Sequence, residues 1–199
     1  EKFSRAWGAT LSDKPGLTVV EITPAAEAGR VKGLYVVGEN PLLSDPDLAH
    51  VKTAFEKLDL LVVQDIFMTE TARAADVVLP AACFAEKEGT FTNSERLVQR
   101  VRKAVPAPGQ AREDWEIIAD LSTRLGYPMN YRNSNEIMEE ISSLAPSYAG
   151  ITHARLEKEA MAWPCPTHDH PGTKMLHKER FVRGKGLFNA VEYTPPAEV

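Results

Sequence analysis

The strongest constraint on the fold is the alternation of short apolar runs with helical patterns. Three runs have the length and composition of buried strands, namely "GLYVVGENP" (33–41), "LDLLVVQD" (58–65) and "DVVLPAA" (76–82). An earlier apolar run, "LTVVEI" (17–22), is weaker. Continuous apolar strands are typical of parallel sheets, because both faces of such a sheet are covered.

The segments between these runs predict helices. In the first segment apolar residues recur at three- and four-residue spacing, at Leu48, Val51, Phe55 and Leu58. We expect Ser44 or Asp45 to cap this helix, with Pro46 in its first turn, and Thr69 to cap a shorter helix before the third strand. This order predicts an α/β fold with a doubly wound, mostly parallel, Rossmann-like sheet and right-handed crossovers.

The pattern changes after residue 80. From Leu97 onward polar and apolar residues alternate, which predicts an exposed or edge strand. Two amphipathic helices follow, with predicted apolar faces of Trp115, Ile118, Leu121 and Leu125, and of Ile137, Ile141 and Leu144. The end of the chain is loop-like, with "LFNAVEY" (187–193) as the only later strand candidate. We expect an α/β domain over residues 1–160 and an extended linker towards a following domain over residues 161–199.

Composition and charge narrow the class of protein. The net charge of -5 argues against a nucleic-acid binder, because phosphates are neutralised by clustered Lys and Arg. No apolar run is long enough to cross a bilayer, so direct membrane insertion is not expected. The two cysteines are too few for a disulfide framework, which favours a reducing compartment, and we expect the cytoplasm. The chain begins with Glu1, and we expect it to be a piece of a longer protein.

Polar residues follow each predicted strand. They are Gly38, Glu39 and Asn40 with Ser44 after the first strand, Gln64 and Asp65 after the second, and Ala81 after the third. The carboxyl ends of parallel strands meet at one edge of a sheet, where ligands of such folds bind. We therefore expect these residues to lie close together.

The chemistry of these residues suits a nucleotide. Gly38 permits a tight turn, and a helix start near Ser44 offers free N–H groups to a phosphate. Amide and carboxylate groups of Asn40, Gln64 and Asp65 can bind a base edge or a ribose. Taken singly, Asn40 can equally serve to turn the chain, and Gln64 and Asp65 to cap a helix. The combination favours a nucleotide site.

Other motifs are weaker. Neither GxGxxG nor GxxxxGK[ST] occurs, so there is no ordinary dinucleotide fingerprint and no P-loop. A basic stripe of Arg96, Arg100, Arg102 and Lys103 is usually a solvated strand face, although it can also meet a phosphate. The "HDHP" stretch (168–171) lacks regular ligand spacing. We therefore expect no catalytic and no metal-binding residues in this chain.

Three long motifs resemble a known family: "LYVVGENPLLSDPDL", "LLVVQDIFMTETARAADVVLPAACFAEKEGTFTNSERLVQRVRKAV" and "REDWEIIADLSTRLGYPM". They resemble the molybdopterin oxidoreductases, specifically the catalytic alpha subunit of formate dehydrogenase, over residues 3–193. The resemblance implies the third of four domains. This domain is Rossmann-like and holds one guanine dinucleotide arm of bis(molybdopterin guanine dinucleotide).

The resemblance also implies roles for single residues. Asp114 would bind the guanine, because one carboxylate can accept hydrogen bonds from both the N1–H and the 2-amino group. The plain alternative for Asp114 is a helix cap before Trp115. The remaining cofactor-binding positions would be Gly38, Glu39 and Asn40 against the cofactor, Ser44 near its phosphate or ribose, Gln64 and Asp65 at the nucleotide, and Ala81 through its backbone.

The chain also departs from the family pattern. Leu97 stands where relatives often have the second arginine of "TNxERR", and the family's metal ligand, catalytic histidine and arginine, and iron–sulfur cysteines have no match. The resemblance therefore implies a portion that is not catalytic alone. In the full subunit, formate would be oxidised to carbon dioxide at molybdenum or tungsten.

The implied partners are the remaining domains of the same subunit, which would carry an iron–sulfur cluster, and electron-transfer subunits. Two alternatives share the fold. One is the molybdenum-free large subunit of respiratory complex I, and the other is a related molybdoenzyme such as a nitrate reductase.

Overall fold

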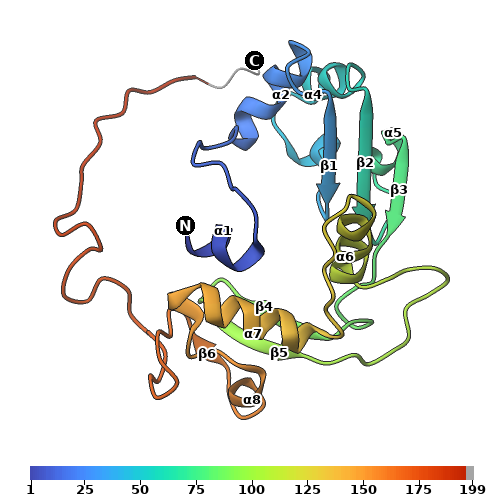
Figure 1. The fold of residues 1–199 in the computed structure, drawn as a ribbon. Helices are drawn as coiled ribbons and strands as arrows, with labels where there is room; N and C mark the ends of the chain where they lie inside the picture. The colour runs from blue at the N-terminus through green and yellow to red at the C-terminus, as the bar shows by residue number, and fades with distance from the viewer. Residues whose placement is uncertain (196–199) are drawn as a thin grey trace.

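Two three-stranded sheets organise residues 1–195 of the chain, the part described by the computed structural model (Figure 1). The first sheet has the order β1-β2-β3 and consists of β1 (Gly33–Val37), β2 (Leu60–Asp65) and β3 (Val77–Pro80). All its strands run parallel, with Val63 of β2 paired to Val36 and to Val78. The prediction of a parallel sheet within an α/β fold is confirmed.

One face of the parallel sheet packs against helices. Val36, Leu61 and Val63 alternate along β1 and β2 and point to the same face, where they are buried. They pack against side chains of α2 (Val19–Glu27), α4 (Leu48–Phe55) and α5 (Glu70–Ala74), namely Ala26, Val51, Ala54, Phe55 and Ala72.

The second sheet is antiparallel, with the order β4-β5-β6, and it consists of β4 (Gly89–Thr92), β5 (Leu97–Val101) and β6 (Met161–Ala162). The prediction of an exposed or edge strand from Leu97 is wrong, because β6 pairs with the second side of β5. Val98 is therefore buried, and it packs with Met138 of α7 (Ser134–Leu144) and with Ile151. The short helices η1 (Pro146–Tyr148) and α8 (His153–Leu156) lie between α7 and β6 in the chain.

Helix starts differ from the predictions in two places. The weaker apolar run at 17–22 enters α2, not a strand, and the Thr18 N–H donates to the Glu21 carboxylate at 2.7 Å. After β1 the helix is split into α3 (Pro41–Ser44) and α4, and Asp47 caps α4 rather than Ser44 or Asp45. The carboxylate of Asp47 accepts the N–H of His50.

The cap of α5 is as predicted, since the Thr69 hydroxyl accepts the Ala72 N–H at 3.1 Å. The residues buried by the two later helices were predicted only in part. Helix α6 (Asp114–Arg124) buries Ile117 and Ala119, whereas Ile118 and Leu125 are exposed. Helix α7 buries Leu144 as predicted, but Met138 rather than Ile141.

Both ends of the described chain lie outside the sheets. Helix α1 (Lys2–Trp7) contacts α7, where the Lys2 ammonium donates to the carbonyls of Ser143 and Leu144 at 2.7 and 2.9 Å. At the other end the chain stays attached up to Lys174, whose carbonyl accepts from the Arg96 guanidinium at 3.2 Å.

From Met175 to Pro195 the chain contains turns and one isolated bridge, between Phe181 and Gly184, but no helix and no strand of a sheet (Figure 1). The strand prediction at 187–193 is wrong, because this segment pairs with no strand. A boundary at residue 161 would assign β6 to the linker although β6 pairs with β5, so we propose that the linker begins after Lys174. None of the helices within residues 1–195 combines the length and apolarity needed to cross a membrane.

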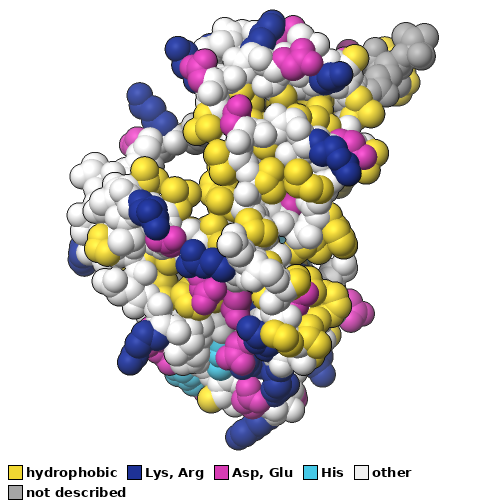
Figure 2. All heavy atoms as spheres, turned by 90° about the vertical axis from the view of Figure 1, so that its right-hand side faces the viewer, with side chains coloured by type: hydrophobic (Ala, Val, Ile, Leu, Met, Phe, Trp, Pro, Cys, Tyr) yellow, Lys and Arg dark blue, Asp and Glu magenta, His cyan; other side chains and the backbone are white. Residues whose placement is uncertain are grey.

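Figure 2 shows the face that lies on the right-hand side of Figure 1, where β3 and α5 are found. On this face Lys and Arg side chains are interspersed with Asp and Glu, and hydrophobic side chains lie between them. Neither sign of charge forms a continuous patch there.

Candidate functional site

The turn after β1 depends on the backbone of a glycine. The Gly38 N–H donates to the Gln64 carbonyl at 2.9 Å, which extends the pairing of β1 with β2. Gly38 then adopts a φ of 64°, a conformation that favours glycine. A Cβ atom added here would meet nothing within 4 Å, so conformation and not space explains the glycine.

The side chain of Asn40 joins this turn to the helix that follows β2. Its Oδ1 accepts the Thr71 N–H at 3.1 Å and the Thr71 hydroxyl at 2.8 Å, and its Nδ2 donates to Glu70 at 2.7 Å. The Asn40 bond lowers the pKa of the exposed Glu70 carboxyl. Thr71 is fully buried and also accepts the Leu42 N–H at 3.1 Å. Thr71 is thus a structural partner that the sequence motifs did not single out.

A second group of hydrogen bonds joins the end of β2 to the start of α6. Gln64 is fully buried, and its Nε2 donates to Asp114 Oδ1 at 2.7 Å, while its Oε1 accepts the hydroxyl of Tyr35. The other oxygen of Asp114 accepts from the Lys87 ammonium. Burial, together with the negative charge of Asp114, raises the pKa of Tyr35, so Tyr35 keeps its proton and remains a donor.

Backbone pairing beyond β3 brings Asp114 to this edge. Ala81 forms a parallel bridge with Arg112, and the Ala82 N–H donates to the Arg112 carbonyl at 2.7 Å. Ala81 itself donates its N–H to the Asp65 carbonyl at 3.1 Å. Helix α6 starts directly after this bridge, which places its first residue, Asp114, beside Gln64.

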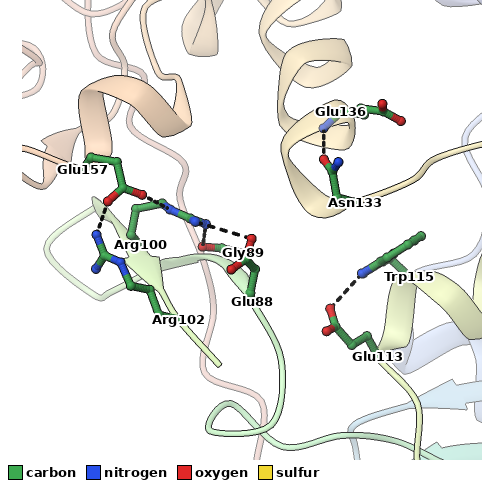
Figure 3. Close-up of polar contacts among 9 residues, drawn as sticks. All are labelled: Glu88, Gly89, Arg100, Arg102, Glu113, Trp115, Asn133, Glu136 and Glu157. Carbon is green, nitrogen blue, oxygen red and sulfur yellow. Dashed lines mark hydrogen bonds and ion pairs between the residues drawn. The ribbon is translucent and has the colours of Figure 1, made fainter. Parts of the chain in front are cut away.

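The N-cap of α6 is Glu113 rather than Asp114. The Glu113 side chain also accepts from the indole N–H of Trp115 at 2.9 Å (Figure 3). The alternative reading of Asp114 as the helix cap is therefore wrong, and its carboxylate is left for Gln64 and Lys87.

The eight predicted site residues are not equally accessible. Gly38, Glu39 and Ser44 are exposed, and the Ser44 hydroxyl donates to the Asn40 carbonyl at 3.2 Å. The Asp65 carboxylate is partly buried and accepts the Phe67 N–H at 3.0 Å. The structure brings Asn40, Gln64, Asp65, Ala81 and Asp114 to one sheet edge, with Ser44 one helical turn further along α3.

A cavity of about 240 Å³ opens beside Asp114. The Asp114 side chain is 32% exposed, and the walls of the cavity are largely apolar and aromatic, including Phe91, Trp115, Ile137, Met138 and Ile141. The hydroxyl of Ser134, which also lines the cavity, is buried without a hydrogen-bond partner. A carboxylate at the rim of an apolar slot suits a flat ligand that carries hydrogen-bond donors.

Two residues of the basic stripe, Arg100 and Arg102, form ion pairs within the molecule (Figure 3). Arg100 donates to the Glu157 carboxylate and to the Gly89 carbonyl, both at 2.9 Å, and Arg102 also pairs with Glu157. These bonds lower the pKa of Glu157. The guanidinium groups of Arg100 and Arg102, at the centre of the stripe, are therefore not free to bind a phosphate. Within residues 1–195, no three His, Cys, Asp or Glu side chains lie close enough together to hold a metal ion.

Sequence relatives of the chain are formate dehydrogenase subunits. The chain is 51% identical over 202 residues to the F420-dependent formate dehydrogenase subunit alpha of Methanocaldococcus jannaschii, covering 99% of this chain and 30% of that protein. It is 44% identical over 191 residues to formate dehydrogenase H of Escherichia coli, covering 94% of this chain and 27% of that protein. The chain thus spans less than a third of the length of these relatives.

A solved structure has a similar fold. Acetylene hydratase from Pelobacter acetylenicus matches 71% of this chain and 20% of its own chain, with a TM-score of 0.58 and 22% sequence identity. At this identity the similarity concerns the fold alone. The family model described as molybdopterin oxidoreductase matches residues 4–124, which include the hydrogen-bonded residues around Asn40 and Asp114 and the whole of α6. The chain belongs to the molybdopterin oxidoreductase family, and this membership implies a molybdopterin cofactor.

Proposed function

We propose that the chain is the cofactor-binding portion of a formate dehydrogenase alpha subunit, and that it holds bis(molybdopterin guanine dinucleotide). One observation carries the nucleotide assignment. The partly exposed carboxylate of Asp114 is fixed between Gln64 and Lys87 at the strand ends, beside an apolar and aromatic cavity. Identities of 44% and 51% to two formate dehydrogenase subunits support formate as the substrate.

The Asp114 carboxylate fits a guanine edge. Each of its oxygens accepts one hydrogen bond, from Gln64 and from Lys87, whereas a carboxylate offers about four acceptor sites. Acceptor sites therefore remain for the N1–H and the 2-amino group of guanine. Because Gln64 is fully buried, we assign it the role of orienting Asp114 rather than of touching the ligand.

Some of the other predicted residues would contact the cofactor, and others would support the residues that do. Exposed Gly38, Glu39 and Ser44 would face the cofactor, and Asp65 has acceptor capacity left for a ribose hydroxyl. The side chain of Asn40 is engaged with Thr71 and Glu70, so it would shape the turn that the cofactor meets. Ala81 would contribute through its backbone.

When bound, the molybdenum or tungsten of the cofactor supplies the redox chemistry of formate oxidation to carbon dioxide. This chain would bind and orient the cofactor, and we assign no catalytic and no metal-binding residue to it. The iron–sulfur cluster, the remaining domains and the electron-transfer subunits would complete the enzyme. The complex I and nitrate reductase alternatives are less well supported, because both relatives described above are formate dehydrogenases.

Purification of the full-length subunit under anaerobic conditions tests this proposal. The metal is measured by mass spectrometry, the guanosine monophosphate released by acid hydrolysis is quantified, and formate oxidation is followed with an artificial electron acceptor. We expect metal, guanine nucleotide and formate-dependent activity together in the full-length subunit, and no activity in the 199-residue chain alone. Formate oxidation by the chain alone, or metal without guanine nucleotide in an active subunit, would contradict the proposal.

A further inference from the structure

A second and larger cavity lies away from the strand ends, between α1 and α7. Its volume is about 620 Å³, which is within the range of small-molecule sites. Its walls are mainly aromatic and apolar, formed by Trp7, Tyr127, Met129, Tyr131 and Leu144, and the carboxylate of Glu140 also lines it. None of these residues belongs to the proposed nucleotide site.

Hydrogen bonds hold the walls of this cavity in place. The indole N–H of Trp7 donates to Glu140 Oε1 at 2.7 Å, and the Tyr131 hydroxyl donates to Glu140 Oε2 at 2.6 Å. The Tyr127 hydroxyl donates to the Trp7 carbonyl at 3.2 Å. Helix α1 is therefore bonded to Glu140 and to Tyr127, and these bonds hold the aromatic side chains of the cavity in position.

The carboxylate of Glu140 has only neutral partners. Among the ion pairs formed within residues 1–195, none includes Glu140, and the nearby Lys2 ammonium is bound to the carbonyls that end α7. Burial and the bond to Glu140 raise the pKa of Tyr131 to about 12, so this phenol stays a neutral donor. Each oxygen of Glu140 accepts one bond and keeps an acceptor site.

We propose that this cavity is a binding site for an organic cation, an ammonium or guanidinium group with an apolar body. Aromatic rings attract cations through their electron-rich faces, most strongly when the cation is shielded from water. The carboxylate supplies the opposite charge that the neutral donors Trp7 and Tyr131 leave uncompensated. The same chemistry serves a free small amine or a cationic side chain of a polypeptide.

Calorimetric titration of the full-length subunit tests the site with three probes. Choline represents a free amine, N-acetylarginine amide represents a cationic side chain, and 3,3-dimethylbutanol has the shape of choline without its charge. We expect saturable binding of at least one cation, and binding of the neutral alcohol at least about tenfold weaker than that of choline if choline is the cation bound. Preference for choline assigns the site to free amines, and preference for N-acetylarginine amide assigns it to a polypeptide side chain.

Two variants and one control test the residues. Glu140→Gln keeps the shape of the side chain and removes its charge, and Tyr127→Leu removes an aromatic wall; each should weaken cation binding about tenfold. Glu139→Gln is the matched control, because Glu139 is an exposed neighbour on α7 that bonds to Asn135, and it should leave binding unchanged. Metal content should be the same in all forms, and each variant should unfold cooperatively, which shows that it is folded. The proposal is overturned if neither cation saturates, if a bound choline is matched by the neutral alcohol, or if folded Glu140→Gln binds as the native subunit does.

Discussion

Replacement of Asp114 by asparagine addresses the centre of the proposed nucleotide site. The amide that results has one acceptor oxygen and one donor group, so it presents a donor to the N–H edge of guanine and loses the charge that Lys87 neutralises. Hydrogen bonds to a charged group contribute about 1.5–3 kcal/mol each. Loss of two such bonds amounts to at least ~3 kcal/mol, which corresponds to roughly 100-fold weaker retention of the cofactor.

The assay is the molybdenum or tungsten content and the guanine nucleotide content of the purified full-length subunit after prolonged dialysis. Asp120→Asn is the matched control, because it makes the same change on the same helix, at a carboxylate that pairs with Arg112 and Arg124. We expect Asp114→Asn to lose metal and nucleotide together, and Asp120→Asn to retain both. Retention of both by a folded Asp114→Asn subunit, or equal loss in the two variants, would refute the specific role of Asp114.

Two further predictions concern the stability of the fold. Thr71→Val removes the hydroxyl that bonds Asn40 and Leu42 and leaves the partly buried N–H of Leu42 unpaired, so it should destabilise the α3–α5 contact by about 1–3 kcal/mol. Hydrogen exchange of residues 38–45 should become faster, and unchanged exchange would contradict the role of Thr71. Burial lowers the pKa of His153 from its ordinary value of 6.5, with a further contribution from Arg100, so the unfolded chain binds this proton more tightly than the folded one and stability falls as the pH falls below 6.5. His153→Leu should make the urea-unfolding midpoint less dependent on pH below 6.5, and an unchanged pH dependence would show that other groups cause the loss of stability.

The parallel sheet was predictable because its signals are local. Apolar runs with the length of strands, separated by segments of helical periodicity, specify both the elements and their order along the chain. The cap at Thr69 was predictable for the same reason, since it bonds to Ala72 in the next turn. A helix start set by an unusual backbone conformation, such as Asp47 with a φ of 55°, has no comparable local signal.

The antiparallel sheet was not predictable from such patterns. The alternation from Leu97 onward correctly indicated a strand, but its central position depends on β6, which joins it from a distant part of the chain. The burial of Ile117 rather than Ile118 is another tertiary result, because the pairing of Ala81 with Arg112 fixes how α6 begins against β3. Helical periodicity describes a stripe on a helix, whereas burial depends on what lies opposite that stripe.

The candidate site shows the same division. The sequence alone predicts which elements end in polar residues. Because the carboxyl ends of parallel strands lie at one edge of the sheet, it also predicts that Asn40, Gln64 and Asp65 are neighbours. The burial of Gln64 behind Asp114, the ion pair of Lys87 with this carboxylate and the bond of Thr71 to Asn40 all depend on the packing of the fold. Strand and helix patterns arise from neighbours along the chain, whereas hydrogen bonds between distant side chains depend on how the completed elements pack.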